Sequence, residues 1–125
     1  MTDFSNRKTT VKITNKTQDF AISENAKLAD SFFGRFRGLM LSAPKDIVLV
    51  SPKETIAHSS IHMLFMRFPI DVIWLSSEMV VVDIQRKLKP NTMKISKPQK
   101  AAKYVVEIGH GDAGKTKIGD TLGFI

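Results

Sequence analysis

The feature that most limits the fold of this chain is the shortness of its apolar runs. From residue 47 to the C-terminus, valine, isoleucine, leucine and phenylalanine come in short runs that end at proline, glycine or small polar residues. Runs of this kind are typical of β-strands and too short for most helices. We expect strands at residues 47–50, 60–68, 70–75, 79–88, 104–108 and 121–125.

Two pairs of neighbouring segments predict hairpins. Residues 11–14 and 18–22 alternate apolar and polar side chains around a polar turn, and the runs 70–75 and 79–88 flank a short polar turn. Alternation places every second side chain on the same face of a sheet. The segment 60–68 is instead apolar on both faces, so we expect it to be a central strand.

One short helix is expected between the first hairpin and the later strands. Phe32, Phe36 and Leu39 recur at helical spacing, and Asp30 or Ser31 precedes them as a capping residue. Together the segments predict a mainly β fold. We expect a small antiparallel β-barrel or β-sandwich with this one helix.

The size of the chain favours one hydrophobic core. With 125 residues, we expect a single β domain over residues 11–125 and a loose polar segment at 1–10. The sequence has no cysteine, which excludes disulfides and thiolate metal sites and suits a reducing cytoplasm. The N-terminus lacks the apolar core of a signal peptide, and the stretch 61–75 is interrupted and shorter than the ~20 residues of a membrane span. We therefore expect a cytoplasmic protein with no membrane partner.

The formal net charge of +7 is concentrated in one part of the chain. Between residues 84 and 104 all the charged side chains are basic, and they form the candidate anion-binding set: Arg86, Lys87, Lys89, Lys94, Lys97, Lys100 and Lys103. Such a surface attracts polyanions over roughly a Debye length. The alternative is that these side chains only keep the surface soluble.

Residues 109–116, GHGDAGKT, match the P-loop consensus G-x-x-x-x-G-K-[ST] letter for letter. In a P-loop, a helix begins at the lysine and threonine and points its N-terminus at the phosphates. Here Gly119 and Asp120 indicate a turn, and the sequence ends shortly afterwards. We therefore reject a nucleotide-hydrolase assignment. A weaker role stays open, in which backbone amides of residues 109–115 hold an anion.

A second candidate set could line a pocket: Arg35, Arg37, His62, Arg67 and Asp71. Asp71 stands among apolar residues, so its carboxylate must be paired or hydrogen-bonded unless it serves as an acid or base. We favour pairing with Arg67 or with the arginines of the helix, and the same interpretation applies to Glu107. His58 and His62 lie four residues apart, which in a strand gives no ready chelate. We therefore assign no catalytic residue, metal ligand or cofactor.

Several motifs recur together along the chain: R-x-R-G-L-M at 35–40, I-H-M-L-F-M-R-F-P-I-D-V-I at 61–73, L-K-P at 88–90, A-K-Y-V-V-E-I-G-x-G at 102–111 and G-D at 119–120. In this combination the chain resembles a prokaryotic family known as domain of unknown function 192. The resemblance covers roughly residues 11–124. It implies a small β-sandwich or barrel with a short helix, and it implies no catalytic residue, because the family has no established activity.

The leading functional hypothesis is a non-enzymatic binding domain whose basic surface meets an anionic partner, with nucleic acid as one such polyanion. The first alternative is a small-molecule or metal-binding domain, or an unrecognised enzyme, that uses His62, Asp71 and the neighbouring arginines. A third is a protein-interaction module with its six methionines as adaptable surface.

Overall fold

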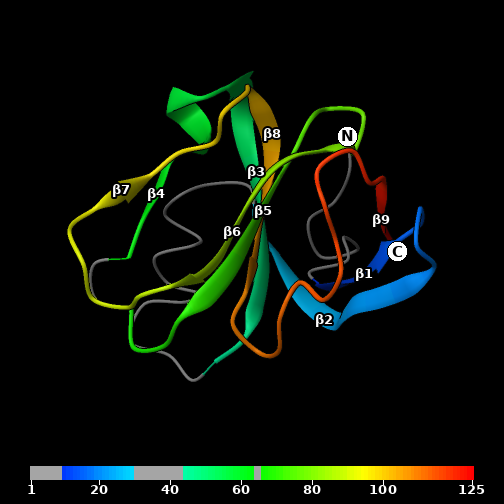
Figure 1. The fold of residues 1–125 in the computed structure, drawn as a ribbon, viewed down its shortest axis with the longest axis horizontal. Coiled ribbons are helices and arrows are strands. Elements are labelled where there is room, and N and C mark those ends of the chain that lie inside the picture. The colour runs from blue at the N-terminus through cyan, green and yellow to red at the C-terminus, as the bar shows by residue number, and fades with distance from the viewer. Residues whose placement is uncertain (1–9, 30–43, 64–65) are drawn as a thin grey trace, which may run out of the picture.

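The computed structural model describes residues 10–29, 44–63 and 66–125, and over these ranges the fold is mainly β (Figure 1). The strands are β1 (Thr10–Asn15), β2 (Phe20–Ala29), β3 (Asp46–Thr55), β4 (Ile61–His62), β5 (Ile70–Leu75), β6 (Val81–Leu88), β7 (Ile95–Ser96), β8 (Ala102–Ile108) and β9 (Leu122–Phe124). One 3-10 turn, η2 (Ala57–Ser59), follows β3. Seven strands form one sheet in the order β6-β5-β8-β3-β2-β1-β9, and β4 pairs with β7 beside it.

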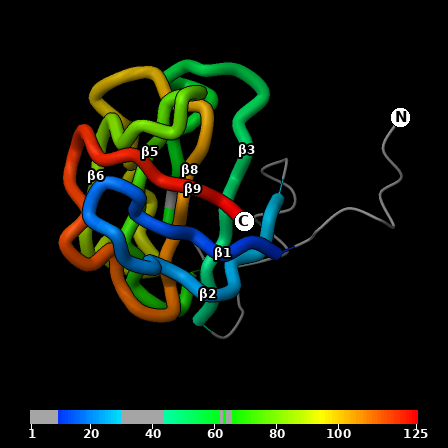
Figure 2. The backbone as a smooth tube through the Cα atoms, turned by 90° about the vertical axis from the view of Figure 1, so that its right-hand side faces the viewer, coloured from blue at the N-terminus to red at the C-terminus, as the bar shows by residue number. Residues whose placement is uncertain are grey.

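The seven-stranded sheet curls until its two outer strands approach each other. Val80 and Thr121 form a bridge between the start of β6 and the start of β9. The amide of Val81 also donates to the carbonyl of Asp120 at 2.8 Å. The curl can be followed in Figures 1 and 2, where β9 runs beside β1. The mainly β fold expected from the sequence is confirmed, and of the two architectures expected the curled sheet resembles the barrel. The approach of the outer strands leaves little free sheet edge.

Hydrophobic cores lie on both faces of the central strands. In β5 every residue is buried, with Val72 and Trp74 on one face and Ile73 and Leu75 on the other. Successive side chains of a strand point to opposite faces, so a strand covered on both sides has no polar alternation. The indole Nε1 of Trp74 donates to the carbonyl of Ser59 at 2.7 Å, which fixes η2 against the core. Central strands therefore account for the two-sided apolar runs.

The two predicted hairpins are confirmed as β1–β2 and β5–β6. The expectation of a purely antiparallel sheet is wrong at one place, because Ala26–Ala29 of β2 pair in parallel with Asp46–Leu49 of β3. Parallel neighbours need a crossover connection, and most of the chain between β2 and β3 lies outside the described residues. The helix expected near residues 30–40 lies outside the described residues.

The expectation of a central strand at residues 60–68 is also wrong. Among the described residues of this segment only Ile61 and His62 form a strand, and they pair with β7 rather than with the main sheet. Met63, Met66 and Phe68 are nevertheless buried, because they pack into the apolar cluster on the outer face of the sheet. A segment that packs its side chains onto a sheet and a strand within the sheet can therefore have the same apolar sequence pattern.

Candidate anion-binding site

An irregularity in the β5–β6 hairpin shapes the candidate site. The register of the pairing shifts between Ile70 and Val72, so that Arg86 and Lys87 of β6 both stand opposite Asp71. Lys87 takes a left-handed backbone conformation with φ 53°. A bulge of this kind bends its strand and redirects side chains, and bulges are common beside functional sites. The bulge turns Lys87 toward solvent at the edge of the hairpin.

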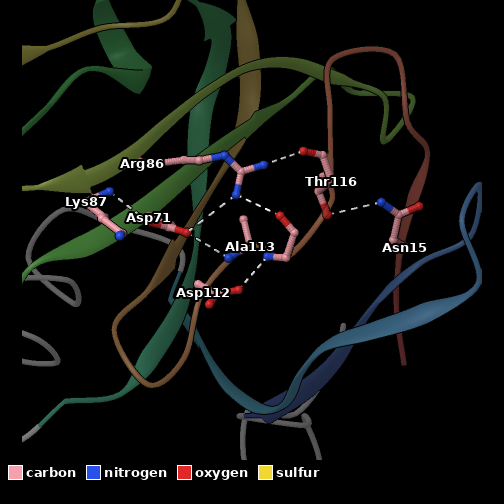
Figure 3. A network of polar contacts seen from close by, with 8 residues as sticks. Asn15, Asp71, Arg86, Lys87, Asp112, Ala113 and Thr116 are labelled. Carbon is pink, nitrogen blue, oxygen red and sulfur yellow. Dashed lines mark hydrogen bonds and ion pairs between the residues drawn. The ribbon is translucent and has the colours of Figure 1, made fainter.

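Asp71 holds this bulge in place (Figure 3). Its Oδ1 accepts the amide of Lys87 and its Oδ2 accepts the amide of Ala113, each at 2.8 Å. Arg86 Nη1 lies 3.9 Å from Oδ2. The ionic partner of this buried carboxylate is thus Arg86, whereas Arg67, one of the partners expected, is exposed. Asp71 is structural in its contacts, since both of its oxygens are already in use.

Two members of the basic set donate hydrogen bonds to backbone carbonyls of the protein. Arg86 donates from Nη1 to the carbonyl of Gly114 at 2.8 Å and from Nη2 to that of Thr116 at 2.7 Å, so its guanidinium fastens the loop after β8 (Figure 3). Lys103 Nζ donates to the carbonyl of Ser51 at 2.7 Å. These two cations brace the fold and have less freedom than their neighbours to meet a ligand.

The other five members of the set are exposed: Lys87, Lys89, Lys94, Lys97 and Lys100. Across the part of the chain that the structure describes, the ion pairs within 4.0 Å are Lys12 with Glu24 and Arg86 with Asp71. None of the five ammonium groups therefore has a described carboxylate that neutralises it. The positive field of this stretch is left open to solvent.

Three of these lysines surround one pocket of about 400 Å³. Lys87, Lys89 and Lys94 share its lining with Met63, Leu88, Thr92 and Ser96. Its lining residues come from the end of β6, the connection after it and the β4–β7 ladder; these strands can be found at the left of Figure 1. Its size falls within the range of small-ligand sites, ≈ 300–1,000 Å³. Apolar side chains and cations are thus combined in one concavity.

The segment 109–116 does not have the structure of a P-loop. After Thr116 the chain makes a turn and enters β9, so no helix begins there. Lys115 Nζ lies 5.7 Å from the centre of the Phe20 ring, and Thr116 is buried with its Oγ1 accepting Asn15 Nδ2 at 3.1 Å. The buried threonine is thus not available for magnesium, and no helix N-terminus points at the loop to hold phosphates. The rejection of a nucleotide hydrolase is thereby supported.

The weaker possibility, a backbone nest for an outside anion, meets a second obstacle. The amides of Gly109 and His110 donate to Asp46 Oδ1 at 3.0 and 2.8 Å, and the amide of Ala113 donates to Asp71. The amide of Gly114 donates to Asp112 at 2.7 Å. The loop therefore already holds anions, and these are carboxylates of the protein itself.

The other residues singled out from the sequence are only partly described. Arg35, Arg37 and the side chain of His62 lie outside the described residues. Within the described ranges, no group of three or more His, Cys, Asp and Glu side chains is placed to hold a metal ion. Over the same ranges, the structure contains no helix with the length and apolarity of a membrane span. Glu107 is fully buried between strands β3 and β5.

A buried carboxylate also joins the two ends of the domain. Asp120 Oδ2 accepts Asn15 Nδ2 at 2.9 Å, Gln18 Nε2 at 2.7 Å and the amide of Lys117 at 3.0 Å. Burial by itself raises the pKa of Asp120, but these hydrogen bonds and the charge of Lys117 outweigh it and hold the pKa below the ordinary value of 3.8. The Gly119-Asp120 turn thus fastens the β1–β2 turn to β9.

We expect the D120N variant to lose about 1–2 kcal/mol of stability at pH 7, because charge-assisted hydrogen bonds become neutral ones. A carboxyl with a lowered folded-state pKa stabilises the fold above its unfolded pKa, and this contribution is lost as the pH falls through the folded pKa. Urea titrations at pH 7, 5 and 3 should therefore show the difference between wild type and variant shrinking below about pH 4. A difference that stays constant down to pH 3 would contradict the assignment.

Comparison with known proteins gives the family context of this site. The family model described as DUF192, "Uncharacterized ACR", matches residues 11–124. A UPF0127 protein of Thermococcus kodakarensis is 46% identical over 97 residues, which is 76% of this chain and 60% of that protein. A UPF0127 protein of Pyrococcus furiosus is 40% identical over 86% of this chain and 93% of its own length. The chain thus spans less than two thirds of the first relative and nearly all of the second.

Two crystal structures share the fold. A protein of unknown function from Novosphingobium aromaticivorans has a TM-score of 0.74 and 17% identity, covering 91% of this chain and 83% of its own. A Sinorhizobium meliloti protein, named as a candidate transcription regulator, also has a TM-score of 0.74, with 19% identity over 92% of both chains. At these identities the likeness concerns the fold alone.

Proposed function

The chain belongs to the DUF192 family, and from its surface we propose that it is a non-enzymatic binding domain that meets a nucleic acid through the lysines around β6 and β7. The observation that carries this proposal is the set of five exposed lysines with no described carboxylate to neutralise them. Phosphate groups of a nucleic acid would pair with these ammonium groups and release their own condensed counterions.

The distribution of contacts favours binding over catalysis. Asp71 is the carboxylate that the sequence singled out as a possible acid or base, but both of its oxygens accept hydrogen bonds from backbone amides. Asp46 likewise accepts two amides and the hydroxyl of Ser23. The buried carboxylates with known contacts thus hold loops, whereas the unpaired charges are on the surface. This division is typical of a rigid scaffold that presents a charged face.

The proposal is tested with fluorescent single-stranded DNA and RNA oligonucleotides titrated at several salt concentrations. Each phosphate contact contributes about −0.7 to the slope of log affinity against log salt for single strands, so the triple variant K94Q/K97Q/K100Q should reduce the slope by about 2. At low salt we expect its affinity to fall at least about tenfold. The control is K16Q/K27Q/K53Q, which removes the same net charge from exposed lysines elsewhere in the chain.

The control separates a binding surface from general attraction to a cationic protein. If both triple variants weaken binding to the same extent, net charge and not this surface is responsible. Failure of the wild-type protein to retain either nucleic acid at low salt would overturn the proposal outright.

A further inference from the structure

We infer that the pocket lined by Lys87, Lys89 and Lys94 is a site for a terminal phosphate monoester together with the compact group attached to it. This inference rests on the proposed function, because it assigns one particular contact within the basic surface. The same chemistry is offered by the phosphorylated end of an oligonucleotide and by a free nucleoside monophosphate. A phosphodiester inside a strand differs from both, since it carries a single negative charge.

The charges of the pocket match a dianion. The three lysines that line it have no described carboxylate partner. A phosphate monoester carries about −1.5 to −2 charges at pH 7, because its second pKa is about 6. Two or three ammonium groups around one such group therefore match its charge, whereas the single charge of a diester would leave more of their positive charge uncompensated. Lys97 and Lys100 belong to the same basic stretch but do not line this pocket.

A largely buried serine marks the inner wall. Ser96 is 6% exposed and lines the pocket. Its hydroxyl makes no hydrogen bond to another residue in the described ranges and keeps some contact with solvent, so it is free to donate to a ligand. A phosphate oxygen in the pocket would accept this hydrogen bond. The remaining inner surface is apolar, with Met63 and Leu88, and suits a base or another compact group next to the phosphate.

The backbone around the pocket is held in an unfavourable conformation. Lys87 and Asn91 both have left-handed backbones, with φ of 53° and 54°, and they bracket the segment 88–90. Asp71 fixes Lys87 through its amide, and the amide of Asn91 donates to the carbonyl of Met63 at 2.8 Å. A lysine is rarely found in this region of backbone space, whereas glycine and asparagine enter it readily. Strain of this kind concentrates at functional sites.

The experiment compares three probes at equal ionic strength. The first is a single-stranded oligonucleotide of about ten nucleotides with a phosphate at its 5′ or 3′ end. The second has hydroxyl ends and two further nucleotides, so that its total charge matches that of the first. The third is a nucleoside monophosphate. Its binding is measured by NMR, from changes in the chemical shifts of the backbone amides of residues 87–96.

We expect the end-phosphorylated oligonucleotide to bind at least about fivefold more tightly than its charge-matched partner, which corresponds to about 1 kcal/mol, the net value of a typical hydrogen bond. This preference should disappear below about pH 6, where the monoester loses its second charge. The nucleoside monophosphate should shift the amides that line the pocket. The K89Q/K94Q and S96A variants should lose the preference, and K97Q/K100Q should bind both oligonucleotides more weakly but keep their ratio.

The K87G variant separates the site from the stability of the fold. Glycine removes the ammonium group and relieves the left-handed backbone, so the variant should lose the preference while its melting temperature stays the same or rises. A loss of preference together with a lower melting temperature would mean that the lysine side chain supports the fold.

The experiment distinguishes failure of the pocket assignment from failure of the proposed nucleic-acid binding. If both oligonucleotides bind equally and the monophosphate shifts no pocket amide, the pocket assignment is overturned while the proposed function stands. If the monophosphate binds in the pocket but no oligonucleotide is retained, the proposed function fails and the pocket is a small-molecule site. If no probe binds, both are overturned.

Discussion

Replacing Asp71 by alanine is expected to lower the free energy of unfolding by about 2–4 kcal/mol, because two backbone amides lose the carboxylate that accepts their hydrogen bonds. The carboxylate is 5% exposed and joins three parts of the chain: β5, the bulge at Lys87 and the loop at Ala113. Its removal leaves two amide groups without an acceptor, and each buried unsatisfied donor costs about 1–3 kcal/mol. Arg86 loses its only described carboxylate partner as well.

Urea titrations of D71A against wild type at pH 7 measure this effect. The D71N variant should fall between the two, because an asparagine keeps one acceptor oxygen but turns a donor toward the other amide. D112N is the matched control: Asp112 lies in the same loop, is exposed and accepts only the amide of Gly114 among the described residues. Its loss should be below about 1 kcal/mol, the net value of an exposed hydrogen bond.

The stability of D71A also bears on the interpretation of Asp71 itself. A carboxylate kept for acid–base chemistry is commonly held at some expense of stability, so its removal would leave the fold unchanged or more stable. If D71A proves as stable as wild type, the structural role described above is wrong. The alternative function predicted from the sequence, in which Asp71 acts together with His62 and the neighbouring arginines, would then be the better starting point.

The sequence predicted the parts of the fold that depend on neighbouring residues. Alternation in the two hairpins and the short turn before Met79 are local signals, and both hairpins are present. The prediction of a central strand at residues 60–68 was wrong. Apolar side chains of a segment that packs onto a sheet give the same sequence pattern as apolar side chains within a strand. The parallel pairing of β2 with β3 depends on where a crossover returns, which no local pattern encodes.

The same distinction applies to the candidate site. The lysines were visible as a charge pattern, and five of them are exposed as such a pattern suggests. The bracing roles of Arg86 and Lys103 could not be foreseen, since their acceptors at Thr116 and Ser51 are 30 and 52 residues away. The left-handed backbone of Lys87 gives no sequence signal either, because lysine is not a residue that favours it.

Gly109 is the first glycine of the segment that matches the P-loop consensus, and we expect it to serve packing instead of phosphate binding. We expect G109A to be destabilised by about 2–4 kcal/mol, because a β-carbon at this position has no free space. It would lie 2.6 Å from the backbone carbonyl oxygen of Lys45 and would overlap the ring of Phe68. The ring can shift, but the carbonyl is held by hydrogen bonding to the amide of Gly109 at 3.2 Å. The end of β8 would therefore have to move away from the segment before β3.

Two variants distinguish this packing role from a phosphate-binding role. H110A changes the neighbouring exposed residue and should alter stability by no more than about 0.5 kcal/mol. K115A removes the residue that would contact phosphates in a P-loop. Here it should cost only the exposed cation–π contact with Phe20, about 0.5–1 kcal/mol, and leave nucleotide affinity unchanged. Thermal and urea unfolding of the three variants, with and without added nucleotide, measure these differences. If G109A unfolds like wild type while K115A abolishes binding of a nucleoside triphosphate, the glycine-rich segment serves a ligand and the packing argument fails.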